Sequence, residues 1–205
     1  MKQMFFHAGS FSHQLCTAAW VYSKADKQYM FLGSRGSIAE TACEPSEFLS
    51  NTELEAMVRE CLKNSPAGDC PDGPYGHIGD WPVSRVTDMH NVFYHASQFN
   101  ADISTWDVSS VTTMCGMFRN AELFECDLSK WDVSSTKDMS TMFRAASMFN
   151  SDLSKWDVSS IFNMFALFNK ATQFNGDIST WDVSSVVNMG YMFRDARSFL
   201  SLIHI

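Results

Sequence analysis

A repeat of 25 residues governs the sequence from residue 81 onward. Tryptophan recurs at Trp81, Trp106, Trp131, Trp156 and Trp181 without an insertion or a deletion. Four further columns each hold one residue type: Met89, Met114, Met139, Met164 and Met189; Phe93, Phe118, Phe143, Phe168 and Phe193; Ala96, Ala121, Ala146, Ala171 and Ala196; and Phe99, Phe124, Phe149, Phe174 and Phe199. One such unit is too small to bury its own apolar face, so consecutive units must stack around a shared core. The sequence therefore predicts a solenoid over residues 81–205, with about five repeats, the last one incomplete.

The amino-acid composition and the net charge indicate a folded chain and disfavour some classes of binding partner. Hydrophobic residues make up 45% of the chain and charged residues 19%, which is typical of a folded protein. The 15 Lys and Arg against 23 Asp and Glu give a formal charge of −8. Such a balance disfavours binding to phosphate backbones or anionic lipid. We therefore expect no nucleic-acid partner, and no apolar run approaches the length of a membrane span.

Within one repeat the apolar residues change their period. Those of the first part have the spacing of a leucine-rich strand: Ile103, Trp106 and Val108. Those of the second part have helical spacing: Met114, Met117, Phe118 and Ala121. The predicted fold class is an α/β repeat, a leucine-rich-repeat-like solenoid. Each repeat would contain one short strand, over 102–108 in this copy, and one short helix or 3-10 turn, over about 110–121.

Alternation along the expected strand directs the residues between the core positions to an outward face. This face is the predicted ligand-binding surface, and it consists of Thr105, Asp107, Ser109, Lys130, Asp132, Ser134, Lys155, Asp157, Ser159, Thr180, Asp182 and Ser184. One of its positions changes between Thr and Lys while the core columns stay fixed. The variation thus lies where a partner would make contact.

The aspartates of this face would form a line of like charges if the strands stack about 4.8 Å apart. The repulsion costs on the order of 1 kcal/mol per neighbour in water, so something should offset it. The carboxylates could accept hydrogen bonds from backbone amides and neighbouring hydroxyls and hold a turn. They could instead bind a cation such as calcium or receive a basic partner. A second row, Asp102, Asp127, Asp152 and Asp177, is interpreted as scaffold.

Residues 99–121, 149–171 and 174–196 share the pattern Phe-Asn-x-Asp-Ile/Leu-Ser-x-Trp-Asp-Val-Ser-Ser, followed by Met and Met-Phe-x-x-Ala with minor departures. This pattern closely resembles the BspA-like leucine-rich repeat family, found in mycoplasma surface lipoproteins and in marine algae and other protists. The resemblance covers about residues 80–205. It implies a curved solenoid and a role in cell-surface adhesion or protein binding, at the cell surface or outside the cell. It implies no catalytic residues.

Residues 51–80 are similar to the cap that precedes such repeats in algal members of that family. Apolar residues in this segment have helical spacing: Leu54, Met57, Val58, Cys61 and Leu62. We expect a helix there that covers the open end of the core. Residues 1–50 carry no repeat, and polar residues interrupt the apolar stretch after Lys2, which disfavours a signal peptide. We interpret them as a disordered leader or a short accessory segment.

The six cysteines do not form a framework of disulfides. Cys61 and Cys70 flank a short Ser-Pro-Ala-Gly-Asp turn, and a local disulfide that locks the cap is predicted if the protein is exported. The spacing of Cys and His does not match a zinc site, so no metal and no cofactor is expected. No convergent acid, base and nucleophile and no Gly-rich phosphate loop is present in the sequence. We therefore expect the chain not to be an enzyme.

The predicted function is a non-enzymatic protein-interaction or cell-surface adhesion module that receives a protein ligand or a cell-surface component on its concave, acidic face. The alternative is a solenoid that binds calcium, or an ordered surface such as ice or mineral, through the Asp and Ser ladders. At the carboxyl end, Leu200 and Leu202 replace polar residues of the earlier repeats, and Ile203 falls in a strand column. This uncovered end predicts end-to-end self-association through residues 193–205, a partner that covers them, or a truncated gene product.

Overall fold

The computed structural model describes residues 14–15, 37–38, 51–71 and 76–199. The chain divides into two compact units, Met1–Ser46 and Glu47–Ile205. In the first unit, β1 (Gln14–Leu15) pairs in parallel with β2 (Ser37–Ile38). The interpretation of residues 1–50 as a leader or accessory segment otherwise lies outside the described residues.

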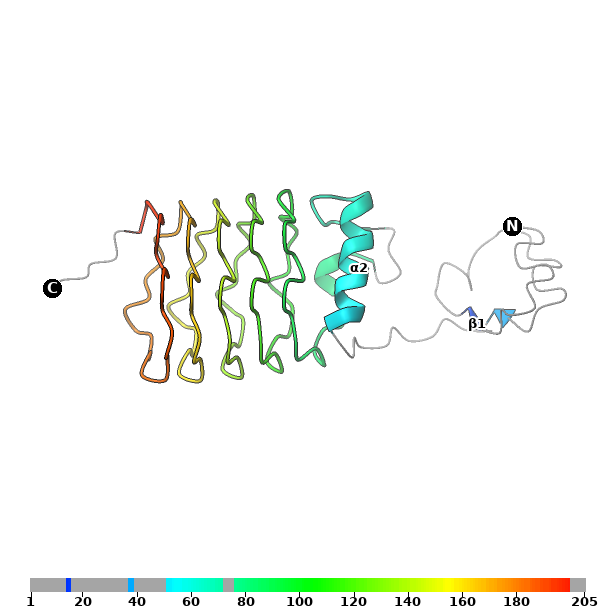
Figure 1. Ribbon diagram of the computed structural model, residues 1–205. Coiled ribbons are helices and arrows are strands. Elements are labelled where there is room, and N and C mark those ends of the chain that lie inside the picture. Colours follow the sequence, from blue (N-terminus) through cyan, green and yellow to red (C-terminus); the bar gives the residue numbers. More distant parts are fainter. Residues whose placement is uncertain (1–13, 16–36, 39–50, 72–75, 200–205) are drawn as a thin grey trace. The chain divides into compact units, whose positions relative to one another are not determined.

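The second unit begins with the helix α2 (Asn51–Asn64), which lies at one end of the repeats (Figure 1). Glu53 in its first turn and Lys63 in its last turn complement the helix dipole. The apolar side of the helix packs into the same core as the repeats: Leu54, Val58 and Cys61 are buried, while Met57 and Leu62 are partly buried. A short 3-10 helix, η1 (Ile78–Asp80), leads from this region into the first repeat. The expected cap helix is therefore present.

Consecutive repeats stack as parallel coils, and we call each 25-residue unit of residues 81–199 a coil (Figure 1). Parallel backbone bridges join residues 25 apart: Asp88 to Thr113, Thr113 to Asp138, Asp138 to Asn163 and Asn163 to Asn188. Around each bridge, a row of amides donates to carbonyls of the following coil, as Phe118 N does to Met142 O at 2.9 Å. The 25-residue period of the sequence is thus the period of the backbone hydrogen bonds.

The predicted fold class is wrong, because residues 76–199 contain no strand and, apart from η1, no helix. In the segment expected to be a strand, Trp106 N donates to Ile103 O at 3.1 Å, which closes a turn. The coils are joined there by side chains instead of a backbone ladder. Four Trp indoles each donate to the carbonyl of the residue 28 positions earlier: Trp106 to Ile78, Trp131 to Ile103, Trp156 to Leu128 and Trp181 to Leu153, at 2.8–3.2 Å.

The expected helix is replaced by a series of turns. In an α-helix every amide after the first turn donates four residues back. Here the amides alternate. Met117 N, Arg119 N and Ala121 N donate three residues back within the coil, whereas Met114, Gly116, Phe118 and Asn120 donate to the next coil. Gly116 and Asn120 have positive φ values of 63° and 62°, which no α-helix contains. The residues with helical spacing still face the core, because the series of turns keeps them on one side.

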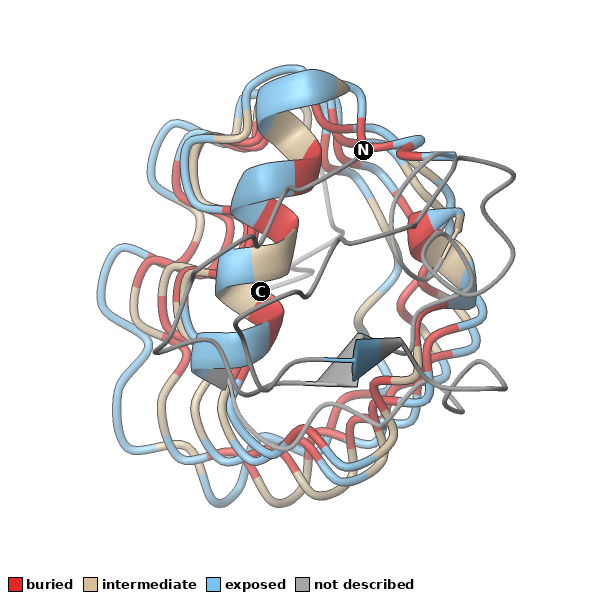
Figure 2. Cartoon of the chain, turned by 90° about the vertical axis from the view of Figure 1, so that its right-hand side faces the viewer, coloured by how far each residue is buried: buried red, intermediate tan, exposed pale blue. Residues whose placement is uncertain are grey.

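Two columns of phenylalanine rings form the centre of the core. In the first column Phe118, Phe143 and Phe168 stack with ring centroids 5.7 Å apart and nearly parallel planes. In the second, Phe124 and Phe149 stack at 5.9 Å. Within each coil the two rings stack at 3.8–4.0 Å. Buried segments therefore recur at the same places in successive coils (Figure 2).

One turn position requires a positive φ in every coil, and glycine occupies it only at Gly116. A Cβ at Gly116 would overlap Asn91 Oδ1. We expect Gly116→Ala to lower the free energy of unfolding by about 2 kcal/mol in urea titrations, because strain and overlap add. Gly190→Ala is the control, since its φ is not positive and its Cβ would meet the side chain of Phe165 at 3.2 Å. Equal effects of the two substitutions would contradict this explanation.

Candidate functional site

The predicted ligand-binding face lies on one arc of the coils, which we call the acidic arc (residues 100–109, 125–134, 150–159 and 175–184). Nine members of the face are exposed: Thr105, Asp107, Lys130, Asp132, Lys155, Asp157, Thr180, Asp182 and Ser184. Ser109, Ser134 and Ser159 are half-buried. The acidic arc contains nine carboxylates and two lysines. The structure thus brings the predicted residues together on one surface.

Each aspartate of the face closes a small turn with the serine two residues later. Asp132 Oδ1 accepts hydrogen bonds from Ser134 N at 3.0 Å and from Ser134 Oγ at 2.6 Å. The equivalent bonds occur at Asp107 and Asp157, and Asp182 accepts from Ser184 N at 3.0 Å. These bonds occupy one oxygen of each carboxylate and support the scaffold explanation of the row over the cation explanation.

Hydrogen bonds outweigh the repulsion between these neighbours. The Ser134 hydroxyl and amide lower the pKa of Asp132, whereas the charge of Asp157 raises it by less. The pKa values of Asp157 and Asp182 are lowered in the same way by Ser159 and Ser184. Asp132, Asp157 and Asp182 are therefore ionised at neutral pH without a bound cation, which leaves a line of negative charge facing solvent.

The lowered pKa values predict that acid weakens the fold. The ordinary value of these groups is 3.8, so the unfolded chain takes up protons at a higher pH than the folded chain does. Stability is therefore constant above about pH 5 and falls as the pH decreases through 4 and below. We expect the urea midpoint to drop between pH 5 and pH 3. The double variant Asp132→Asn with Asp157→Asn keeps the acceptor oxygens and should show a smaller drop. A urea midpoint that rises on acidification would contradict the lowered pKa values of these aspartates.

The variable position of the face also has a structural role in two coils. Thr105 Oγ1 donates to Gly79 O at 2.9 Å, and Thr180 Oγ1 donates to Ser154 O at 2.8 Å. The lysines at this position, Lys130 and Lys155, are exposed and have no ion pair among the described residues. A substitution at Lys130 or Lys155 would therefore remove no hydrogen bond to an earlier part of the chain, whereas a substitution that removes the hydroxyl of Thr105 or Thr180 would remove one.

The second aspartate row is scaffold, as its bonds show. Each carboxylate accepts from the serine amide two residues later, at 2.9–3.0 Å for the four residues Asp102, Asp127, Asp152 and Asp177. Asn side chains next to this row bind the following coil, and Asn100 Oδ1 accepts from Glu125 N at 3.0 Å. The described residues contain no group of three or more His, Cys, Asp or Glu that could hold a metal ion.

A second charged surface was not predicted from the sequence. It lies at the turns that follow the first phenylalanine column, and we call it the basic corner (residues 93–97, 118–122, 143–147, 168–172 and 193–197). Its five cations are Arg119, Arg144, Lys170, Arg194 and Arg197, and its two carboxylates are Glu122 and Asp195. The repeat pattern of the sequence does not reveal this surface, because its cations are distributed over three columns that also contain Tyr, His, Asn, Ala, Ser and Thr.

A groove of about 560 Å³ separates this corner from α2 at the first coil. Arg59 and Lys63 of the helix and Tyr94 and His95 of the coil are among its lining residues. Glu55 also lines the groove and pairs with Arg59 at 2.6 Å. Lys63 lies 3.7 Å from Glu60, so both helix cations of the groove have a carboxylate beside them. The groove therefore joins the basic corner to the helix without adding unpaired positive charge.

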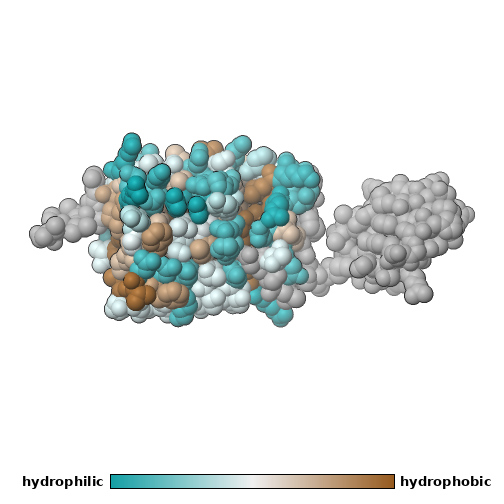
Figure 3. Space-filling view, in the orientation of Figure 1, coloured by the Kyte–Doolittle hydropathy of each residue, from teal (hydrophilic) through white to brown (hydrophobic). Residues whose placement is uncertain are grey.

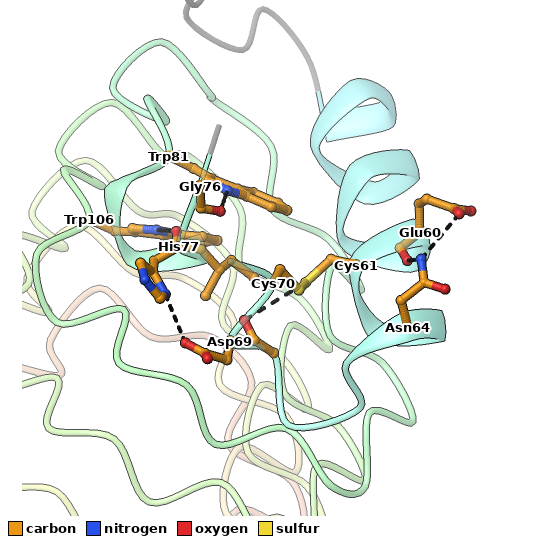
Figure 4. The surroundings of a disulfide bond; sticks show 11 residues. Glu60, Cys61, Asn64, Asp69, Cys70, Gly76, His77, Trp81 and Trp106 are labelled. Carbon is orange, nitrogen blue, oxygen red and sulfur yellow. Dashed lines mark hydrogen bonds and ion pairs between the residues drawn. A yellow bond between two sulfur atoms is a disulfide. The ribbon is translucent and has the colours of Figure 1, made fainter. Parts of the chain in front are cut away.

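The helix is tied to the loop after it by a disulfide between Cys61 and Cys70, the pair expected from the sequence, with Cα atoms 5.6 Å apart (Figure 4). Asp69 lies beside it and binds His77 Nδ1 at 2.8 Å, which raises the pKa of His77. Both cysteines are buried. The disulfide thus fixes the C-terminal half of α2 to the loop that follows the helix.

The last described coil exposes apolar side chains: Val183, Val187, Met189 and Tyr191, with Val187 82% exposed. Brown, apolar atoms are visible near this end of the coils in Figure 3. Residues 200–205, including Leu200, Leu202 and Ile203, lie outside the described residues. End-to-end self-association through residues 193–205 remains a prediction.

One family is recognisable in the chain. The model of the family described as "Mycoplasma protein of unknown function, DUF285" matches residues 52–164 and 127–204, two overlapping segments that agree with tandem repetition. No curated protein and no solved structure matches the chain. None of the described helices is both long and apolar enough to cross a membrane. Because the two matches together span residues 52–204, the chain belongs to this mycoplasma-type repeat family.

Proposed function

We propose that the chain is a non-enzymatic interaction module that binds a basic segment of a partner protein along the acidic arc. The observation that carries the proposal is the excess of carboxylates on this arc, nine against two lysines, over a core that hardly varies. The aspartates are held by their serine partners, so the charges are fixed in place before a partner arrives. Such preorganisation lowers the entropy cost of binding.

The variable position supports the same proposal. Lys130 and Lys155 make no hydrogen bond or ion pair among the described residues, and they lie in the middle of the acidic row. Hydrogen bonds from serines two residues later lower the pKa values of Asp127 and Asp152, and the charges of Lys130 and Lys155 lower them further, but neither lysine is held by a direct bond. An exposed side chain without such a bond, at a central position, is suited to selecting a partner. Charge complementarity of this kind steers association and excludes wrong partners.

We further propose that the chain acts at a cell surface, as BspA-like surface repeat proteins do. The support is the repeat pattern of residues 99–121 and its later copies, together with the disulfide between Cys61 and Cys70. Disulfides persist in oxidising compartments and are rare in the cytosol. Adhesion to another cell or to its matrix is the role that we propose for the acidic arc in this setting.

The proposal is tested with a synthetic 20-residue peptide rich in Lys and Arg, labelled for fluorescence anisotropy and titrated with the full chain at two salt concentrations. The test variant is Asp132→Asn with Asp157→Asn, because asparagine retains the oxygen that accepts the Ser134 and Ser159 bonds. We expect the variant to bind at least tenfold more weakly, and salt to reduce the difference.

The matched control is Glu122→Gln with Asp195→Asn, which removes two carboxylates from the basic corner. Both groups are exposed, so the substitution changes the net charge by the same amount as the test variant. We expect the control to bind the peptide as tightly as the unmodified chain does. Equal weakening by the two double variants would show that net charge alone attracts the peptide, and the proposal would then be wrong.

A further inference from the structure

The basic corner is continuous from coil to coil, because backbone hydrogen bonds join its members directly. His95 N donates to Arg119 O at 2.9 Å, Asn120 N donates to Arg144 O at 2.8 Å, and Lys170 N donates to Arg194 O at 2.8 Å. Cations of adjacent coils therefore start from neighbouring backbone positions. At least one cation lies in each of four successive coils, which matches a linear ligand with repeated negative charges better than a compact one.

The charges of the corner are poorly neutralised by the chain itself. Among the described residues, Arg119, Arg144 and Lys170 have no ion pair, and Arg119 Nε is buried without a hydrogen-bond partner. Arg194 lies 3.7 Å from Asp195, and both side chains are more than half exposed. Arg119, Arg144 and Lys170 have no carboxylate partner among the described residues, and in a chain with a net charge of −8 such cations indicate an anionic ligand.

The groove beside α2 supplies an aromatic surface at one end of this track. Tyr94 is 41% exposed as a residue and lines the groove with Arg59, Lys63 and His95, whose ring meets the Tyr94 ring edge to face with centroids 4.1 Å apart. The guanidinium of Arg119 lies 5.2 Å from the centre of the Tyr94 ring, which joins the groove to the corner. A pyranose ring presents a C–H face that packs on an aromatic ring, while its carboxylate or sulfate pairs with Arg or Lys.

Other linear anions fit these features less well. Single-stranded nucleic acid is held by successive aromatic platforms along a basic track. Among the described lining residues of the groove, Tyr94 is the one six-membered aromatic ring. The basic corner of the following coils offers Arg and Lys side chains, so a series of aromatic platforms for successive bases is missing from these described residues. An acidic peptide offers carboxylates but no repeated ring face for Tyr94.

We propose that the basic corner and the groove beside α2 bind a linear acidic polysaccharide, with a charged sugar ring on Tyr94 and the following charges on Arg119, Arg144 and Lys170. This surface shares no residue with the acidic arc, so the inference does not depend on the proposed function. It assigns the chain two separate binding surfaces of opposite charge.

The experiment titrates the full chain with two labelled polysaccharides, heparin and polygalacturonate, at low and physiological salt. The test variant is Arg144→Gln with Lys170→Gln, and the matched control is Lys130→Gln with Lys155→Gln on the acidic arc. All four side chains lack ion pairs among the described residues, and each double variant removes two positive charges. We expect the test variant to bind at least tenfold more weakly and the control to lose less than twofold.

Two further measurements separate the ligand classes. Tyr94→Ala should weaken polygalacturonate binding at least fivefold and leave the binding of poly-glutamate, which has no ring face, unchanged. Binding of poly-glutamate or of a 20-nucleotide poly-dT as tightly as the polysaccharides, with the same dependence on Arg144 and Lys170, would overturn the polysaccharide assignment. Equal loss in the test and control variants, or no binding of either polysaccharide, would overturn the proposal as a whole.

Discussion

Phe143→Ala should lower the free energy of unfolding by about 4 kcal/mol, the largest effect we expect from a single substitution. Phe143 is fully buried and stacks on Phe149 at 3.8 Å. Its ring also stacks on Phe118 and Phe168, each 5.7 Å away. Removing the ring leaves a cavity in the middle of a column that continues through the neighbouring coils. Guanidinium titrations followed by tryptophan fluorescence measure the loss.

The control for this substitution is Phe162→Ala. Phe162 lies in the next coil and is 46% exposed, so less apolar contact is lost with it. We expect a change below about 1 kcal/mol, as is usual for exposed positions. If Phe143→Ala cost no more than Phe162→Ala, the stacked columns would not be the main support of the coils.

Loss of the disulfide is expected to have the second largest effect. Cys61 and Cys70 close a loop with a sequence separation of nine residues, which corresponds to about 2.5 kcal/mol in the chain-entropy treatment. The double variant Cys61→Ala with Cys70→Ala should therefore melt roughly 5–10 °C below the oxidised chain. The reason is that α2, which covers the open end of the core, is no longer tied to the loop that follows it.

Reductant provides the control for the disulfide. The oxidised chain should lose a similar part of its melting temperature on reduction, whereas the double variant should not respond. Cys115→Ala with Cys126→Ala should keep the response, because both of these cysteines are free. Coincident melting of the oxidised chain and the Cys61→Ala, Cys70→Ala variant would contradict a stabilising role for the bond.

The interior of the repeats could be predicted from the sequence. Each residue of a fixed column must pack on its copy in the next repeat, and Phe118, Phe143 and Phe168 are fully buried as that reasoning requires. The helix α2 was predictable for a similar reason, since its apolar side follows one period over three turns. In both cases the pattern of apolar side chains is enough to predict the structure, because these residues are placed by the burial of their side chains.

The backbone of the coils was not predictable in this way. A short run of apolar residues at helical spacing fits both a helix and a series of turns, because both place those residues on one side. The difference lies in where the amides donate, and Phe118 N donates to Met142 of the next coil. That choice depends on the neighbouring coil. Gly116, which has a positive φ, was a local sign that a helix could not continue.

The candidate site could be predicted only in part. The acidic arc was visible because its aspartates and serines recur in fixed columns. The basic corner was missed because Arg119, Arg144 and Lys170 fall in columns without a constant residue, and their surface exists only once the coils stack. The groove beside α2 depends on how the helix lies on the first coil, which no repeat pattern describes.

We propose that the chain carries two separate surfaces of opposite charge, each with its own ligand. The most direct measurement titrates three forms of the full chain with two probes, the Lys- and Arg-rich peptide and polygalacturonate. The forms are the unmodified chain, Asp132→Asn with Asp157→Asn, and Arg144→Gln with Lys170→Gln. We expect the first double variant to weaken only the binding of the peptide and the second to weaken only the binding of the polysaccharide. If each variant instead shifted both affinities in opposite directions by similar factors, net charge would explain the binding, and the two surfaces would not be separate sites.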